Sequence, residues 1–127
     1  MAVSKVSKGV LSLNGLTAAL NPWPLAQEQV IDGSPHAAGA MLWQSDDKRS
    51  GNGIWECTPG TFTWEYVWDE TMYVIEGKAA VTDDEGNGIA VQAGDLVFVP
   101  TGTRTTWTVV SEIRKAFHFR SDEPVSL

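Results

Sequence analysis

The stretch that decides the fold holds Glu70-Thr-Met-Tyr-Val-Ile-Glu-Gly77 and, after an acidic turn, Gly94-Asp-Leu-Val-Phe-Val-Pro-Thr-Gly102. Each segment is a short apolar run bounded by glycine or proline. The turn between them is Asp83-Asp-Glu-Gly-Asn-Gly88, whose residues favour chain reversal. This stretch therefore predicts short strands joined by tight turns.

The same pattern extends along most of the chain. We expect strands at 38–44, 53–58, 61–67, 70–76, 78–82, 89–92, 95–99, 104–110 and 113–120. Many short strands with turn residues between them predict an all-β sandwich or closed barrel over residues 36–127. Residues 1–35 lack this alternation. They predict an irregular N-terminal arm that packs on the barrel or on a partner, because its leucines and Trp23 need an apolar surface.

Length and charge exclude several classes of protein. A chain of 127 residues is long enough for one domain with its own core. The net charge of −7 argues against nucleic acid and anionic membranes as partners, because both require clustered basic residues. No apolar run is long enough to span a bilayer, and no convincing signal peptide precedes residue 35, so we expect a cytoplasmic protein. The single cysteine, Cys57, is expected to be a buried thiol.

The two segments resemble the two motifs of the cupin superfamily. The first motif reads His-x-His, then glutamate and glycine, and the second reads glycine, Pro-x-Gly and histidine. The chain keeps the non-histidine positions at the expected spacing, namely Glu70, Gly77, Gly94, Pro100 and Gly102. In place of the histidines it has Trp64-Glu65-Tyr66 and Thr105. The resemblance implies a double-stranded β-helix, the cupin jelly-roll barrel, in agreement with the strand pattern.

A narrower resemblance rests on Gly53-Ile-Trp-Glu-Cys-Thr-Pro-Gly60, Thr106-Trp107 and Arg114-Lys115. These segments look like the small single-domain cupins of the (S)-ureidoglycine aminohydrolase type. That group includes hydrolases that release ammonia at a metal centre, and the ethanolamine-utilisation cupin. The hydrolases are two-barrel chains with histidine ligands, and this chain departs from them on both points.

Glu70 and Lys115 are the candidate catalytic residues. Residues 113–119 alternate so that Ile113, Lys115, Phe117 and Phe119 share one face, and the apolar members mark that face as inward. Lys115 would then lie beside Glu70, whose buried carboxylate needs a compensating group. The pair is either a polar anchor or general acid/base for a ligand, or a structural ion pair.

Trp64, Tyr66, Thr105 and Trp107 are the candidate substrate-binding residues. They occupy or flank the lost histidine positions, and the three aromatic rings among them either fill the barrel or wall an apolar pocket. We expect no metal and no other cofactor, because imidazole and thiolate are absent from the motif positions. A metal recruited through Glu65 and Glu70 stays an alternative.

These observations predict a metal-free cupin that binds a small organic ligand in its barrel. The alternatives are an aminohydrolase or isomerase using Glu70 and Lys115, and a structural or assembly dimer. We also expect a homodimer, because six tryptophans and an apolar arm exceed what a small barrel buries. His36 lies in a predicted turn and His118 on an outward face, so neither is assigned to a site.

Overall fold

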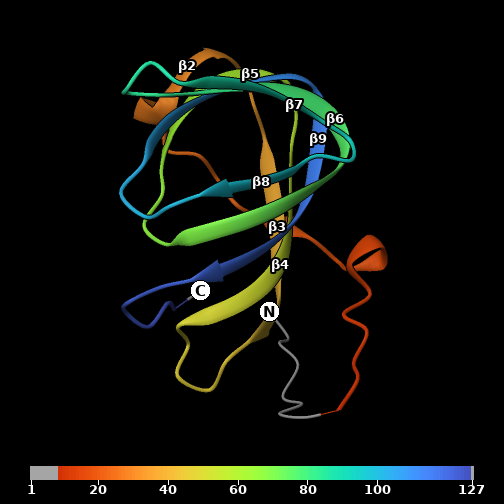
Figure 1. The fold of residues 1–127 in the computed structure, drawn as a ribbon. Helices are drawn as coiled ribbons and strands as arrows, with labels where there is room; N and C mark the ends of the chain where they lie inside the picture. Colours follow the sequence, from red (N-terminus) through yellow and green to blue (C-terminus); the bar gives the residue numbers. More distant parts are fainter. Residues whose placement is uncertain (1–8, 127) are drawn as a thin grey trace.

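The computed structural model describes residues 9–126, which form one curled nine-stranded sheet (Figure 1). The strands are β1 (Asn21–Pro22), β2 (Val30–Gly33), β3 (Ala37–Gln44), β4 (Ser50–Cys57), β5 (Gly60–Glu65), β6 (Asp69–Asp83), β7 (Gly88–Gln92), β8 (Leu96–Val99) and β9 (Arg104–Arg120). Two short 3-10 helices, η1 (Gly15–Thr17) and η2 (Gln27–Gln29), lie in the N-terminal part. The prediction of an all-β jelly-roll barrel is confirmed.

Two long strands hold the barrel together. β6 and β9 pair with each other along nearly their whole length, from Asp69 opposite Arg120 to Asp83 opposite Thr105. The C-terminal part of β9 also pairs with β4, and its N-terminal part pairs with β5. Along β6, β8 pairs near the start and β7 near the end. Each long strand therefore contributes to both ends of the barrel.

Gly77 explains how β6 can continue from one end of the barrel to the other as a single strand. Gly77 has φ +93°, and a Cβ atom at this position would overlap the backbone oxygen of Glu112 on β9. The register between the two strands shifts around this point, so β6 bulges and bends without ending. The separate strands expected at 70–76 and 78–82 are thus one strand. The pair expected at 104–110 and 113–120 is likewise the single strand β9.

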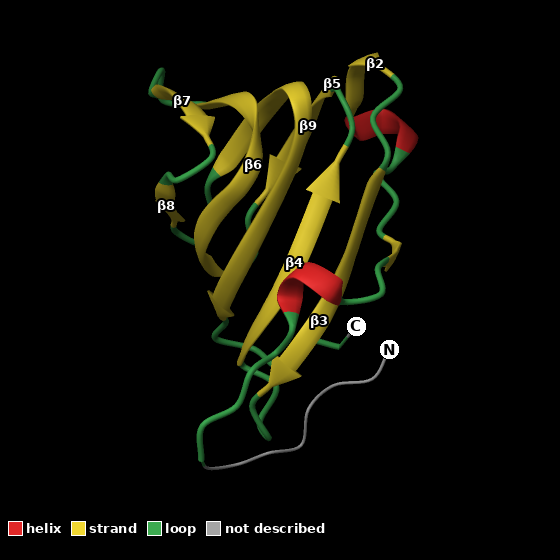
Figure 2. Cartoon of the chain, turned by 90° about the vertical axis from the view of Figure 1, so that its right-hand side faces the viewer, coloured by secondary structure: helices red, strands yellow, loops and turns green. Residues whose placement is uncertain are grey.

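The described part of the N-terminal segment adds strands that the sequence pattern did not predict. β1 pairs with β3, and β2 pairs with β5. η1 crosses the outer face of β3 and β4, where Gly15 lies close to the side chains of Leu42 and Ile54 (Figure 2). Trp23 and Leu25 pack against the core. β1 and β2 span two and four residues, too few to show an alternating pattern.

The core lies inside the curl. Ile113, Lys115, Phe117 and Phe119 are all buried, which confirms the inward face predicted for this part of β9. Trp55, Trp68 and Trp107 are buried as well, and Trp23, Trp43 and Trp64 are partly buried. The single chain therefore covers its six tryptophans to a greater extent than the sequence led us to expect.

Candidate functional site

A buried ion pair lies at the centre of the barrel. Lys115 Nζ is 2.5 Å from Glu70 Oε2, and the two side chains are 7% and 4% exposed. Glu70 is on β6 and Lys115 on β9, where it pairs with Val74, four residues beyond Glu70. The two side chains extend along the barrel interior and meet, as their inward positions predicted.

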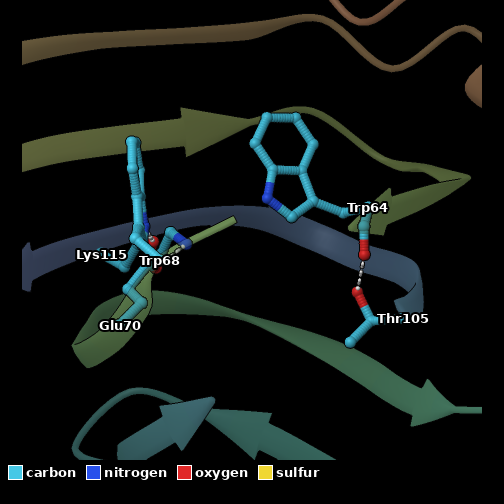
Figure 3. Close-up of polar contacts among 5 residues, drawn as sticks. All are labelled: Trp64, Trp68, Glu70, Thr105 and Lys115. Carbon is cyan, nitrogen blue, oxygen red and sulfur yellow. Dashed lines mark hydrogen bonds and ion pairs between the residues drawn. The ribbon is translucent and has the colours of Figure 1, made fainter. Parts of the chain in front are cut away.

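The second oxygen of the carboxylate also has a partner. The indole Nε1 of Trp68 donates a hydrogen bond to Glu70 Oε1 at 3.0 Å, and the Trp68 ring stacks on Phe119 with a centroid separation of 4.4 Å. Figure 3 shows Trp68, Glu70 and Lys115 grouped together. Sequence reasoning missed Trp68, because it lies between the strands expected at 61–67 and 70–76, where alternation assigns no face.

Three aromatic rings surround the ammonium group of Lys115. Its Nζ atom lies 4.9 Å from the ring centroid of Trp55, 5.3 Å from that of Trp107 and 5.8 Å from that of Phe117. These distances are within the range in which the negative face of a ring attracts a cation. The charge on Lys115 is thus compensated by one carboxylate and by three ring faces.

The space left around this pair is small. Trp64, Tyr66, Glu70, Trp107 and Lys115 all line one cavity, so the structure brings five of the six candidate residues together. The cavity has a volume of about 20 Å³, which is room for roughly one water molecule. No substrate larger than water fits beside Glu70 and Lys115 in this arrangement.

Tyr66 is neutral in this environment. Burial raises the pKa of the Tyr66 phenol well above its ordinary value, the nearby Glu70 charge raises that pKa further, and a hydrogen bond with Trp107 opposes both effects. The phenol is therefore a fixed part of the wall and not a proton donor near neutral pH.

Thr105 lies apart from the small cavity. Its hydroxyl donates a hydrogen bond to the backbone oxygen of Trp64 at 2.7 Å (Figure 3). Thr105 and Trp107 instead line a second, open hollow of about 740 Å³, bounded by β7, β8, the 83–88 turn and the 100–103 loop. Binding sites for small molecules commonly have volumes of about 300–1,000 Å³. The candidate residues are thus divided between two spaces that share Trp107.

The residues at the cupin metal positions do not fit a transition metal. Both oxygens of Glu70 already have partners, and Trp64, Tyr66 and Thr105 replace the histidines. Glu65 is exposed and pairs with Arg104 at 2.9 Å, whereas Glu70 is buried. Among residues 9–126, no three His, Cys, Asp or Glu side chains gather in a group that could hold an ion.

The two histidines lie outside both spaces. His36 and His118 are exposed, and His118 Nδ1 is 2.6 Å from Asn52 Oδ1 on the adjacent strand. Within the described residues, no helix is both long enough and apolar enough to cross a membrane.

Comparison with known proteins places these features in a family. The sequence profile of the EutQ-like cupin domain matches residues 44–117. A 64-residue segment is 33% identical to the acetate kinase EutQ of Clostridioides difficile (strain 630), and the match covers 50% of this chain and 40% of that protein. The chain therefore spans less than half of the length of this curated relative.

Two solved structures agree with the fold. A protein of unknown function from Pseudomonas syringae pv. tomato DC3000 is 27% identical with a TM-score of 0.73, over 81% of this chain and 45% of that one. The EutQ protein of C. difficile is also 27% identical, with a TM-score of 0.62 over 70% of this chain and 66% of that one. The finer resemblance to ureidoglycine aminohydrolases stays a prediction.

Proposed function

We propose that this chain, which belongs to the family of EutQ-like cupin domains, binds a small organic molecule in the open hollow between β7 and β8. The observation that carries the proposal is the size of this hollow, about 740 Å³, with Thr105 and Trp107 in its wall. Both residues were singled out as ligand contacts from the sequence. The buried ion pair behind Trp107 then acts as a rigid support for the ligand site.

The lining of the hollow is suited to a partly apolar ligand. Val81, Val91, Val97 and Val99 contribute aliphatic surface from β6, β7 and β8, and Trp107 contributes a ring. Polar and charged residues also line the hollow, from residues 82–87 and 101–105. Small-molecule sites combine apolar walls with polar groups that orient the ligand.

The charge around the hollow indicates which ligands are favoured. Asp83, Asp84 and Glu85 line it, and Arg104, the one basic residue among the described residues of its lining, pairs with Glu65. This surplus of negative charge favours neutral or cationic ligands over anions. A kinase activity, as named for the C. difficile relative, would require binding an anionic phosphoryl donor, and no unpaired basic side chain lines the hollow within residues 9–126.

An experiment can test the ligand site directly. A fragment library with neutral, cationic and anionic members would be screened by chemical-shift changes, and we expect hits from the first two classes that perturb Trp107. Val97→Trp places an indole ring in the hollow and should weaken binding strongly. Val67→Trp, at an exposed position outside the hollow, should leave it unchanged. Absence of any hit, or binding that survives Val97→Trp, would refute the proposal.

A second candidate, assembly into a homodimer, is favoured by one observation. On the outer face of the barrel, Tyr73 pairs with Leu96 and Thr71 with Phe98, and the three apolar side chains are 49–73% exposed. Neighbouring exposed apolar side chains are typical of interaction surfaces. Sedimentation at micromolar concentration should detect a dimer that Leu96→Asp converts to monomer. A monomeric wild-type protein would exclude it.

The third candidate, an aminohydrolase or isomerase that uses Glu70 and Lys115, has less support. An acid and a base must reach a substrate proton to act on it. Here the two groups bind each other, and the cavity beside them has a volume of about 20 Å³. Such an enzyme would have to open the barrel and break the ion pair before each turnover.

A further inference from the structure

We infer that the barrel interior contains a binding site for an organic ammonium ion, and that the side chain of Lys115 fills this site in the native protein. The site is distinct from the open hollow between β7 and β8. It consists of the Glu70 carboxylate and the faces of Trp55, Trp107 and Phe117. Its ligand class is a primary alkylammonium ion.

The contacts around Lys115 Nζ are those of a recognition site. The carboxylate supplies the charge at 2.5 Å, and the three ring centroids lie at 4.9, 5.3 and 5.8 Å. Aromatic faces around an ammonium group, combined with an acidic side chain, are the means by which proteins bind organic cations. These groups come from three strands, β4, β6 and β9, that pair with one another in the barrel.

The position of Glu70 explains why the site requires a cation. Its side chain is 4% exposed, and apart from Lys115 its carboxylate receives the hydrogen bond from Trp68. A buried carboxylate without a positive partner is strongly unfavourable. The aromatic faces attract an ammonium ion but offer no lone pairs to a metal ion. Ammonium ions therefore match this site better than Na⁺, Mg²⁺ or Zn²⁺.

Removing the Lys115 side chain should expose the site to added ligand. Lys115→Ala keeps Cβ and deletes three carbons and the ammonium nitrogen, which together correspond to n-propylammonium. Ethylammonium is one carbon shorter and allows for contact with the alanine methyl group. Either ion can restore the cation to Glu70 and the ring contacts to Trp55 and Trp107. The wild-type protein, whose site is filled, should bind neither ion at this site.

The experiment measures the unfolding equilibrium of Lys115→Ala with and without the amine. At about 50 mM ethylammonium or n-propylammonium chloride, we expect the folding equilibrium constant of Lys115→Ala to rise on the order of tenfold, and that of the wild type to rise far less. Equal concentrations of sodium chloride and of propan-1-ol are the ionic and neutral controls. An equal response to propanol, or no response of a folded Lys115→Ala protein, would overturn the inference.

Two further variants identify the groups responsible. Lys115→Met fills the place of the lysine with an uncharged side chain of similar length, so its folding equilibrium constant should not change when the amine is added. Glu70→Gln combined with Lys115→Ala removes the carboxylate and should lose the response as well. A tenfold response in either variant would show that the amine acts elsewhere. Binding in the open hollow is tested separately by Val97→Trp, so failure of one proposal leaves the other intact.

The native protein offers a measurement that does not depend on folding of a variant. In a ¹H–¹⁵N spectrum tuned to lysine ammonium groups, an ammonium held among rings should give a slowly exchanging signal, with its Cε protons shifted upfield. That signal should be absent from Lys115→Met. If the native protein shows Lys115 at the position of a solvated lysine, the inference is wrong whether or not Lys115→Ala folds.

Discussion

Removing the cation from the buried ion pair while the carboxylate stays should destabilise the protein strongly. In Lys115→Met the Glu70 carboxylate keeps its hydrogen bond from Trp68 and loses its positive partner. Because the two side chains are 7% and 4% exposed, the buried-pair figure of about 3–5 kcal/mol applies to the free energy of unfolding. That is a large fraction of the roughly 5–15 kcal/mol typical of a whole domain.

The opposite change should cost less. In Glu70→Gln the ammonium of Lys115 keeps an amide oxygen within reach and the three ring faces, so we expect a loss of about 1.5–3 kcal/mol. The double variant Glu70→Gln with Lys115→Met has no buried charge at this place. It should be more stable than Lys115→Met alone, which means that the two changes are not additive.

Urea unfolding followed by tryptophan fluorescence is the assay. For an m-value of about 2 kcal/mol/M, Lys115→Met should lower the midpoint by about 2 M. Arg104→Met is the matched control, since it breaks the exposed pair with Glu65, whose side chains are 71% and 55% exposed; its effect should stay below about 1 kcal/mol. If the Lys115→Met effect is equally small, or the double variant loses the sum of the single losses, the reasoning about the buried pair is wrong.

Other perturbations test the bend, the buried thiol and the metal positions. Gly77→Ala should lower the free energy of unfolding by about 3 kcal/mol or more, because its Cβ would overlap Glu112. Gly86→Ala, also at positive φ but in open space, should lower it by about 1 kcal/mol. Equal losses in urea unfolding would contradict this. Burial raises the pKa of the Cys57 thiol from 9.0 to about 11. The unfolded chain therefore releases this proton at a lower pH than the folded protein does. The free energy of unfolding should fall by up to roughly 2 kcal/mol as the pH rises from 9 to 11. A Cys57→Ala variant should show a shallower fall, and an identical profile would count against the assignment. Elemental analysis after dialysis should find no stoichiometric transition metal. If the protein instead holds about one metal ion per chain, and Glu70→Gln loses it, other ligands have replaced the missing histidines.

Much of the barrel could be predicted because strand positions and inward faces depend on residues that are neighbours in the sequence. Strand positions follow from alternation, and the inward direction of Lys115 follows from Ile113, Phe117 and Phe119 on the same face. The continuity of β6 through Gly77 could not be predicted in this way. A glycine between two apolar runs indicates either a turn or a bulge, and the register with the distant strand β9 decides between them.

The candidate site was only partly predictable for a related reason. Trp68 lies between β5 and β6, where no strand pattern assigns it a direction, so its hydrogen bond to Glu70 escaped the sequence reasoning. Trp55 contacts Lys115 because the two residues stand opposite each other in the β4–β9 pair, 60 positions apart in the chain. Side-chain volumes also determine how much room remains near Glu70, and they depend on packing among strands.

The pairing of β9 has a consequence for how this chain folds during synthesis. β9, spanning Arg104–Arg120, is the strand against which β4, β5 and β6 are all aligned. Contacts between segments so distant in sequence form slowly. While the ribosome has yet to release residue 120, the earlier strands expose apolar faces with no surface to cover them. The nascent barrel then exposes apolar surface of the kind that chaperones bind, and folding is expected to complete only after β9 has left the ribosomal exit tunnel.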